Sequence, residues 1–326
     1  VMELPGENNG RRYELYHKKA TNIAEPGYPA TIAPYQDKDF STKTWNEGGY
    51  SDIDPYESYR AVFNGSLAMY QNPELIFSRG RNQGANSIAE MVKLQMPKTL
   101  GGGSNAYGMT QKMCDAYYMA NGDEFSREHF KEEYPYGTRF VTKEEVEAGT
   151  YPQLKEGVYK EYANREPRFY TAVSYNGSWY ALAGRKFEFF KNQRDNDYTH
   201  DAPQNGYLVR KKVYPQDNPK NGSYKWRQMF LYRLAASYLD YAEAVNEAYD
   251  DRAHREDALK YVNKVRERAG VRQYTLNTVA LDDPKYIHVD DNQLAVREIV
   301  RMERRVELCC EGSRWSDIRR WKIVEQ

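Results

Sequence analysis

The sequence predicts a mainly α-helical protein in which helix pairs of the tetratricopeptide type are joined to a loop-rich portion with short β-hairpins. After residue 225, apolar residues recur at helical spacing with almost no Pro or Gly. Before residue 225, Gly, Asn and Pro separate short apolar runs, as is typical of loops. An Asn-Gly pair between β-prone runs indicates a tight turn between strands. We therefore divide the chain into a loop-rich portion, 1–225, and a helical portion, 226–326, of the same domain.

The first helix of the loop-rich portion is predicted to begin at Asp54. Asp54 suits the N-cap, Pro55 the first helical position and Glu57 the position of the acid in a capping box. We expect this helix to end near Tyr70. The residues that follow, 74–77, indicate a short strand or a buried extended segment.

Two further elements are expected before residue 225. Apolar residues share one face of a helix over about 110–120, and Asn121-Gly122 suits a left-handed cap at its end. Strands at 168–175 and 178–182 flank the Asn176-Gly177 turn, so we expect them to pair as a hairpin.

The helical portion contains one predicted helix pair and a third long helix. The first apolar stripe is Leu231, Leu234, Tyr238, Tyr241, Val245 and Ala248; the second is Ala258, Val262, Val265 and Ala269, and Gly270 ends it. A charged loop, 271–292, leads to a helix with Ile299, Met302, Val306 and Cys309 as its core face, continuing past Gly312 to Trp321. One pair of this type needs stacked neighbours to cover its apolar faces.

Composition and charge narrow the classes of function. The 47 basic and 47 acidic residues give no overall field for nucleic acid or anionic lipid. The sequence contains no apolar run of 18 residues, so it predicts no membrane-spanning helix. The five histidines are scattered without a metal-binding motif, and Cys114, Cys309 and Cys310 are expected to be small buried apolar groups. We predict no metal site and no cofactor.

Charged residues on the last long helix form two ridges of opposite sign. Glu303, Glu307 and Glu311 are spaced four apart, as are Arg297, Arg301 and Arg305. Aligned like charges repel, so we expect these rows to meet opposite charges on neighbouring helices or on Arg314, Arg319 and Arg320. A structural ion-pair network is favoured over a metal-binding or catalytic carboxylate cluster.

The aromatic content is unusual, with 30 tyrosines against 11 phenylalanines and 5 tryptophans. Aromatic planes beside amides or charges match the apolar faces and hydroxyl edges of sugar rings. Side chains in loops are less often buried in a hydrophobic core, so they are more often available to bind a ligand. The predicted ligand-binding residues are therefore those in or beside loops: Tyr35, Trp45, Asn46, Tyr50, Tyr107, Trp179 and Tyr180.

Several segments together resemble the SusD/RagB family of outer-membrane, nutrient-binding lipoproteins of the Bacteroidetes. The last of them contains Glu311-Gly312, Arg314-Trp315, Asp317 and Arg319-Arg320-Trp321. In the family's order, the matching segments are 72–77, 110–113, 115–119, 166–177, 206–207, 211–212, 233–235, 238–244, 265–266, 268–270, 303–308, 311–312, 314–315, 317 and 319–321. No single segment decides the matter, but their combination is specific.

The resemblance implies a SusD-like α-α superhelix of tetratricopeptide-like helix pairs that support a loop-rich ligand-binding portion. It implies a surface-exposed lipoprotein that captures oligosaccharides or other nutrients and delivers them to a TonB-dependent transporter of the SusC type, without catalysis. The family's ligand contacts come from variable loops, so no binding residue is carried over by motif. Because the family's lipid-modified N-terminal cysteine and most of its helix pairs have no match, we expect this chain to be the C-terminal portion of a longer protein, attached to the membrane through an N-terminal lipid anchor.

Two other functions stay open at this point. The predicted helix pair also suits an adaptor that binds only protein. A glycoside hydrolase needs two carboxylates facing across a cleft, and 47 acidic residues leave room for such a pair, although no motif points to one.

Overall fold

The computed structural model describes residues 13–19, 53–78, 85–151, 154–196, 201–277 and 285–323. In the loop-rich portion the α-helices are α2 (Pro55–Phe63), α3 (Ala85–Leu94), α4 (Gln111–Ala116), α5 (Arg127–Glu133), α6 (Lys143–Glu147) and α7 (Pro167–Ala172). In the helical portion they are α8 (Leu234–Ala248), α9 (Arg252–Ala269), α10 (Gln293–Glu307) and α11 (Arg314–Arg320). Short 3-10 turns are η2 (Met69–Gln71), η3 (Lys98–Leu100), η4 (Lys160–Tyr162), η5 (Ala181–Ala183) and η6 (Arg194–Asn196). The mainly α fold is confirmed.

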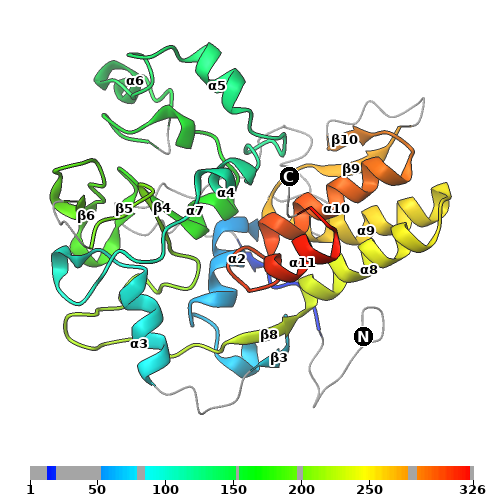
Figure 1. Ribbon diagram of the computed structural model, residues 1–326, viewed down its shortest axis with the longest axis horizontal. Coiled ribbons are helices and arrows are strands. Elements are labelled where there is room, and N and C mark those ends of the chain that lie inside the picture. The colour runs from blue at the N-terminus through cyan, green and yellow to red at the C-terminus, as the bar shows by residue number, and fades with distance from the viewer. Residues whose placement is uncertain are drawn as a thin grey trace.

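The described strands pair two by two. Antiparallel pairs join β1 (Lys18–Lys19) to β2 (Ile53–Asp54), β3 (Leu75–Ser78) to β8 (Phe230–Arg233), β4 (Val173–Tyr175) to β7 (Tyr207–Val209), and β5 (Trp179–Tyr180) to β6 (Arg185–Lys186). A parallel pair joins β9 (Gln273–Leu276) to β10 (Tyr286–Val289). Figure 1 shows α8, α9 and α10 gathered on one side of the molecule and the β4–β6 region on the other.

The predicted helix pair is confirmed as α8 and α9, except that Leu231, predicted to begin the first apolar stripe, lies in β8 and is exposed. Asp251 caps the start of α9 by accepting a hydrogen bond from the backbone of His254 at 3.0 Å, and Gly270 ends the helix at φ 73°. Leu239 and Ala242 of α8 pack with Val262 of α9 in a core that also takes residues from α10. The predicted loop at 271–292 instead contains the strands β9 and β10.

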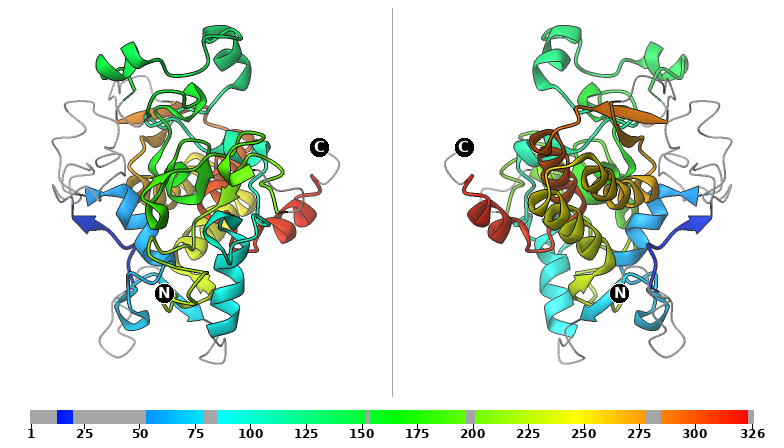
Figure 2. Two further views of the ribbon diagram at one scale, coloured as in Figure 1. Left: turned by 90° about the vertical axis from the view of Figure 1, so that its left-hand side faces the viewer. Right: turned by 90° about the vertical axis from the view of Figure 1, so that its right-hand side faces the viewer.

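Helix α10 contributes to two hydrophobic cores. Val296 and Val300 pack with α8 and α9. Val306 packs in a second core, which is rich in aromatic rings from α7, β4, β7 and the residues just after α4. The helix therefore connects the helical portion to the loop-rich portion. In the two turned views of Figure 2, the α5 and α6 lobe projects from one end of the molecule and α11 from its side.

The predicted helix from Asp54 to Tyr70 begins correctly but ends earlier, at Phe63. Asp54 Oδ1 accepts from the backbone of Glu57 at 3.0 Å, as expected for an N-cap. Asn64 caps the other end, and Gly65 follows at φ 88°, a conformation in which a helix cannot continue. The predicted helix over 110–120 is likewise shorter, because Tyr117 is already extended at ψ 142°.

The predicted hairpin around Asn176-Gly177 is wrong in its pairing. Pro167 occupies the first turn of a helix, α7, so the chain is helical where a strand was expected. The turn itself forms, because Ser178 N donates to Tyr175 O at 3.0 Å. The strands on its two sides nevertheless pair with different partners, β4 with β7 and β5 with β6.

Two expectations for the end of the chain also need correction. The helix predicted to run past Gly312 is two helices, because α10 ends at Glu307 and α11 begins at Arg314. Cys310, at φ 61°, and Gly312, at φ 92°, are left-handed residues that turn the chain between them. Cys114 and Cys309 are buried as expected, but Cys310 is exposed. No described helix is long and apolar enough to cross a bilayer.

Candidate functional site

The structure describes three of the seven predicted ligand-binding residues. Tyr35, Trp45, Asn46 and Tyr50 lie outside the described residues. Tyr107 is 48% exposed, Trp179 is half-buried, and Tyr180 is only 3% exposed. Tyr180 stacks on Phe187 at a centroid distance of 4.4 Å and belongs to a small core, so its ring is used in packing.

The three described residues are brought into one region. Trp179 and Tyr180 line a cavity of about 30 Å³ together with Gln95 and Arg210. The backbone of Tyr107 is bonded to the sequence neighbours of Gln95 and Arg210: its N–H donates to Leu94 O at 2.8 Å, and its carbonyl accepts from Val209 N at 2.9 Å. The cavity has the volume of about one water molecule, so it accepts a hydroxyl but not a sugar ring.

One residue that lines this cavity has a buried polar atom without a partner among the described residues. Gln95 is 5% exposed, and its Oε1 has no hydrogen-bond donor among the described residues. A buried carbonyl oxygen without a donor is unfavourable by about 1–3 kcal/mol. A water or a ligand hydroxyl that enters the cavity beside Trp179 would satisfy it.

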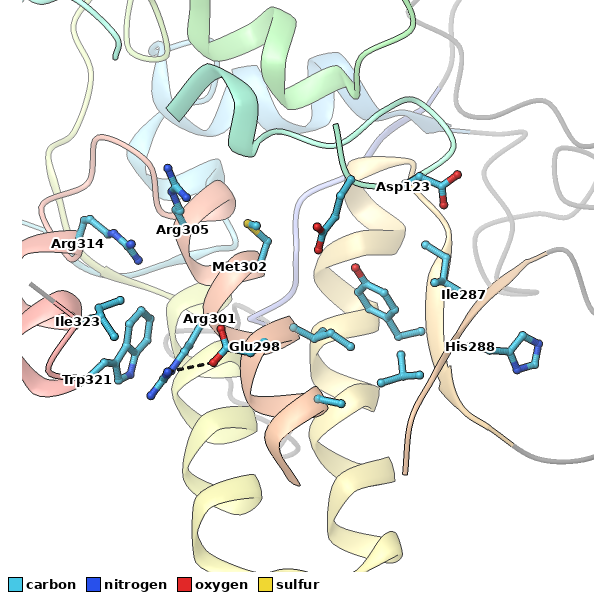
Figure 3. Close-up of a pocket in the computed structure, with 16 residues that line it drawn as sticks. Asp123, Ile287, His288, Glu298, Arg301, Met302, Arg305, Arg314, Trp321 and Ile323 are labelled. Atoms are coloured by element: carbon cyan, nitrogen blue, oxygen red, sulfur yellow. Dashed lines mark hydrogen bonds and ion pairs between the residues drawn. The ribbon is translucent and has the colours of Figure 1, made fainter. Parts of the chain in front are cut away.

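A larger hollow lies on the other side of the described molecule, between α10, β10, the 122–124 turn and the end of α11 (Figure 3). Its volume is about 720 Å³, which is within the range of ligand pockets. We call it the α10 groove. Its apolar lining includes Ile287, Ile299, Met302, Trp321 and Ile323.

Ile299 and Met302 were predicted to face the core, and each packs against one of the two cores, but both are only half-buried and also line the α10 groove. The apolar stripe of α10 is thus wider than the surface that α8 and α9 cover. The signal was present in the sequence, since a single helix pair cannot cover both sides of a third helix. The spacing of apolar residues in the sequence does not determine which of them α8 and α9 leave uncovered, because that depends on how the helices pack.

Charges of opposite sign line opposite sides of the α10 groove. Figure 3 shows Arg301, Arg305 and Arg314 on one side and Asp123 on the other. Arg301 donates to Glu298 at 3.1 Å and lies over the ring of Trp321 at 5.0 Å. Burial and the nearby Arg314 lower the pKa of Arg305. The arginine ridge was predicted from the sequence, but this groove was not.

The predicted ion-pair network is present: its Glu row is buried, whereas Arg297 and Arg301 of the Arg row pair with Glu247 and Glu298 nearer the surface. Glu303 accepts from Arg168 at 2.6 Å and from Arg266 at 3.2 Å. Glu311 accepts from Arg233 and Lys211, at 2.7 and 2.6 Å. Each of these carboxylates is paired with two cationic side chains, as expected for a structural ion-pair network. Among the residues that the structure describes, no group of three or more His, Cys, Asp or Glu side chains is arranged to hold a metal ion.

The fold and these surfaces define a helical scaffold protein: an antiparallel helix pair and a third helix support a loop-rich portion with aromatic side chains near its surface. The chain belongs to the SusD family, whose model matches residues 73–326.

Individual relatives agree with this assignment. SusD-like protein P2 of Formosa agariphila is 27% identical over 172 residues, which are 53% of this chain and 31% of that protein. The crystal structure of a SusD-like protein of Bacteroides fragilis is 26% identical, with a TM-score of 0.57 over 82% of this chain and 47% of that one. A SusD-like carbohydrate-binding protein of Bacteroides fragilis has the same fold, with 22% identity and a TM-score of 0.53 over 81% of this chain and 44% of that one. The chain therefore spans less than half the length of these relatives.

Proposed function

We propose that this chain is part of a cell-surface glycan-binding protein that captures oligosaccharides and delivers them to a SusC-like TonB-dependent transporter of the outer membrane. The observation that carries the proposal is the SusD family match over residues 73–326. One relative of the same fold is a carbohydrate-binding protein, which supports a glycan as the ligand here. In this proposal the chain holds its ligand without altering it.

We propose that the ligand contacts include Tyr107 and Trp179, together with the predicted residues Tyr35, Trp45, Asn46 and Tyr50. Half-buried Trp179 offers an apolar face, and Gln95 Oε1 beside it lacks a donor in the described chain. A sugar ring presents a matching apolar face and hydroxyl donors. Tyr180, at 3% exposure, supports the site from within.

Calorimetry over a panel of oligosaccharides tests the function and the site separately. Trp179→Ala and Trp45→Ala should each weaken binding of the preferred glycan by about tenfold, which corresponds to about 1.4 kcal/mol. Trp315→Ala is the matched control, because Trp315 is a 64% exposed tryptophan on α11, far from β5 in Figure 1. Binding undiminished by the first two changes would remove the site but keep the function. Absence of binding to every glycan, or release of sugar on prolonged incubation, would contradict the function.

An adaptor that binds only protein is a second candidate, favoured by the α10 groove. Its half-buried stripe of Ile299 and Met302 suits the apolar face of a partner helix. Met302→Asp should then abolish capture of the SusC-like transporter in a pull-down while leaving glycan affinity unchanged. Capture of the transporter by a chain that binds no glycan would favour this reading over the first.

A further inference from the structure

Three sulfur atoms from two distant segments meet at the end of α10. Cys309 Sγ lies 3.5 Å from Cys310 Sγ and 4.0 Å from Met109 Sδ. Met109 is 200 residues away from Cys309 in the sequence and lies just before α4. The cluster is therefore a product of the fold rather than of local sequence alone.

The surroundings of the three sulfurs combine rigidity with access. Met109 is 3% exposed and Cys309 6% exposed, and both belong to the aromatic-rich core. Cys310 is exposed, and its φ of 61° turns the chain immediately after Cys309. Two ligands are thus held in a packed interior, while the third opens the cluster to solvent.

We propose that Cys309, Cys310 and Met109 form a binding site for a soft monovalent metal ion of the Cu(I) type. Thiolate and thioether sulfurs select Cu(I) over harder ions. Metal–thiolate bonds are about 2.3 Å long, so sulfurs that share one ion in a trigonal arrangement lie roughly 4 Å apart. The separations of 3.5 and 4.0 Å are already close to this spacing.

Charge at the site also suits a bis-thiolate complex. Both thiols lose their protons on binding, so one Cu(I) ion with two thiolates and a neutral thioether carries one negative charge, and two protons are released. The buried ammonium of Lys211 donates to Cys309 O at 2.9 Å and to Glu311 Oε1 at 2.6 Å, so a cation lies next to the backbone of the cluster.

An anaerobic titration of the fully reduced chain with Cu(I), against a chromogenic chelator of known affinity, tests this site. We expect one ion per chain. Cys310→Ser, which changes an exposed residue, should weaken binding on the order of 100-fold, and Met109→Leu should weaken it about tenfold. Cys114→Ala is the matched control: this cysteine is buried in the same core but outside the three-sulfur group, and its loss should leave the affinity unchanged.

Three results would overturn the proposal. The reduced chain could fail to compete with the chelator, or Cys310→Ser could bind as tightly as the unaltered chain. Equal weakening by Cys114→Ala and Cys310→Ser would point to a general loss of the core. A disulfide between the adjacent cysteines, detected as a mass lower by two hydrogens, is first reversed with a thiol reductant, so that each of these results refers to the reduced chain.

Discussion

Arg168 and Glu307 are 139 residues apart in the sequence, yet Arg168 Nη1 lies 2.9 Å from Glu307 Oε2, and neither side chain is exposed. Glu307 also pairs with Arg268 and, at 2.9 Å, with Arg233. Guanidinium groups from α7, α9 and β8 therefore converge on one carboxylate of α10. Because a displaced partner would leave a buried charge unpaired, this cluster fixes how the four elements meet.

Glu307→Gln should destabilise the protein by about 3–5 kcal/mol, because removing one partner leaves buried guanidinium groups uncompensated. The free energy of unfolding in urea measures the effect. Glu298→Gln is the control, since Glu298 is 72% exposed in its pair with Arg301 and should change stability by less than about 1 kcal/mol. Equal effects of the two changes would contradict the structural role of Glu307.

Stability should fall in acid partly through Glu307. Burial raises the pKa of this carboxyl, but Arg268, Arg233 and Arg168 outweigh burial and lower the pKa well below 4.5. A depressed folded-state pKa stabilises the protein above the unfolded value of about 4.5, and this contribution is lost as the pH falls. The difference in unfolding free energy between the unaltered chain and Glu307→Gln should therefore shrink below pH 4.5. A difference that stays constant down to pH 3 would be inconsistent with this account.

Glu267 should show the opposite dependence on pH. Burial raises its pKa to about 7, against the lowering effects of Lys285 and Lys264. A raised carboxyl pKa favours the folded state below the unfolded value of 4.5, and this advantage is lost between pH 4.5 and 7. Glu267→Gln should thus be more stable than the unaltered chain at pH 8, by roughly 1–2 kcal/mol, and no more stable at pH 4. Thermal unfolding at both pH values measures this, with Glu256→Gln, an exposed residue paired with Arg252, as the control.

Gly177→Ala should destabilise the turn between β4 and β5 more than Gly184→Ala destabilises the turn before β6. Both glycines have positive φ, 88° and 63°. A Cβ on Gly177 would lie 2.3 Å from Val158 Cγ2, whereas nothing lies within 4 Å of one on Gly184. Gly184→Ala should lower the free energy of unfolding by about 1 kcal/mol, because alanine disfavours a positive φ. Gly177→Ala should lower it by roughly 3 kcal/mol, because the clash with Val158 is added to the same effect. Equal urea midpoints would contradict the close approach to Val158.

Local signals in the sequence identified the elements whose ends are set by neighbouring residues. Asp54 caps α2, and Gly270 ends α9, because a capping oxygen and a left-handed φ act within a few residues. The Glu ridge of α10 was correctly assigned to an ion-pair network, since aligned like charges require partners. The family resemblance, confirmed over residues 73–326, accounts for the rest of the fold assignment.

The failures concern partners that lie far away in the sequence. The chain on each side of Asn176-Gly177 is short, and Tyr175 pairs with Tyr207 because β7 covers the open edge of β4, which no local pattern indicates. The α10 groove was missed for the same reason: spacing defines an apolar stripe, but only packing decides that Ile299 and Met302 remain half-covered. The predicted ligand-binding residues stay a prediction, although Tyr180 is now assigned to packing by its contact with Phe187.

Helix α10 belongs to two hydrophobic cores and carries carboxylates that are neutralised from both portions of the chain. The change in composition near residue 225 is consequently not a line along which the protein can be dissected. A fragment that begins after it would contain Glu303 and Glu307 without Arg168. The complementary fragment would leave Arg168 with Glu166 as its only remaining acid among the three with which it pairs. Amide hydrogen exchange in α7 and α10 should therefore report a single shared opening, with the protection of both helices lost together.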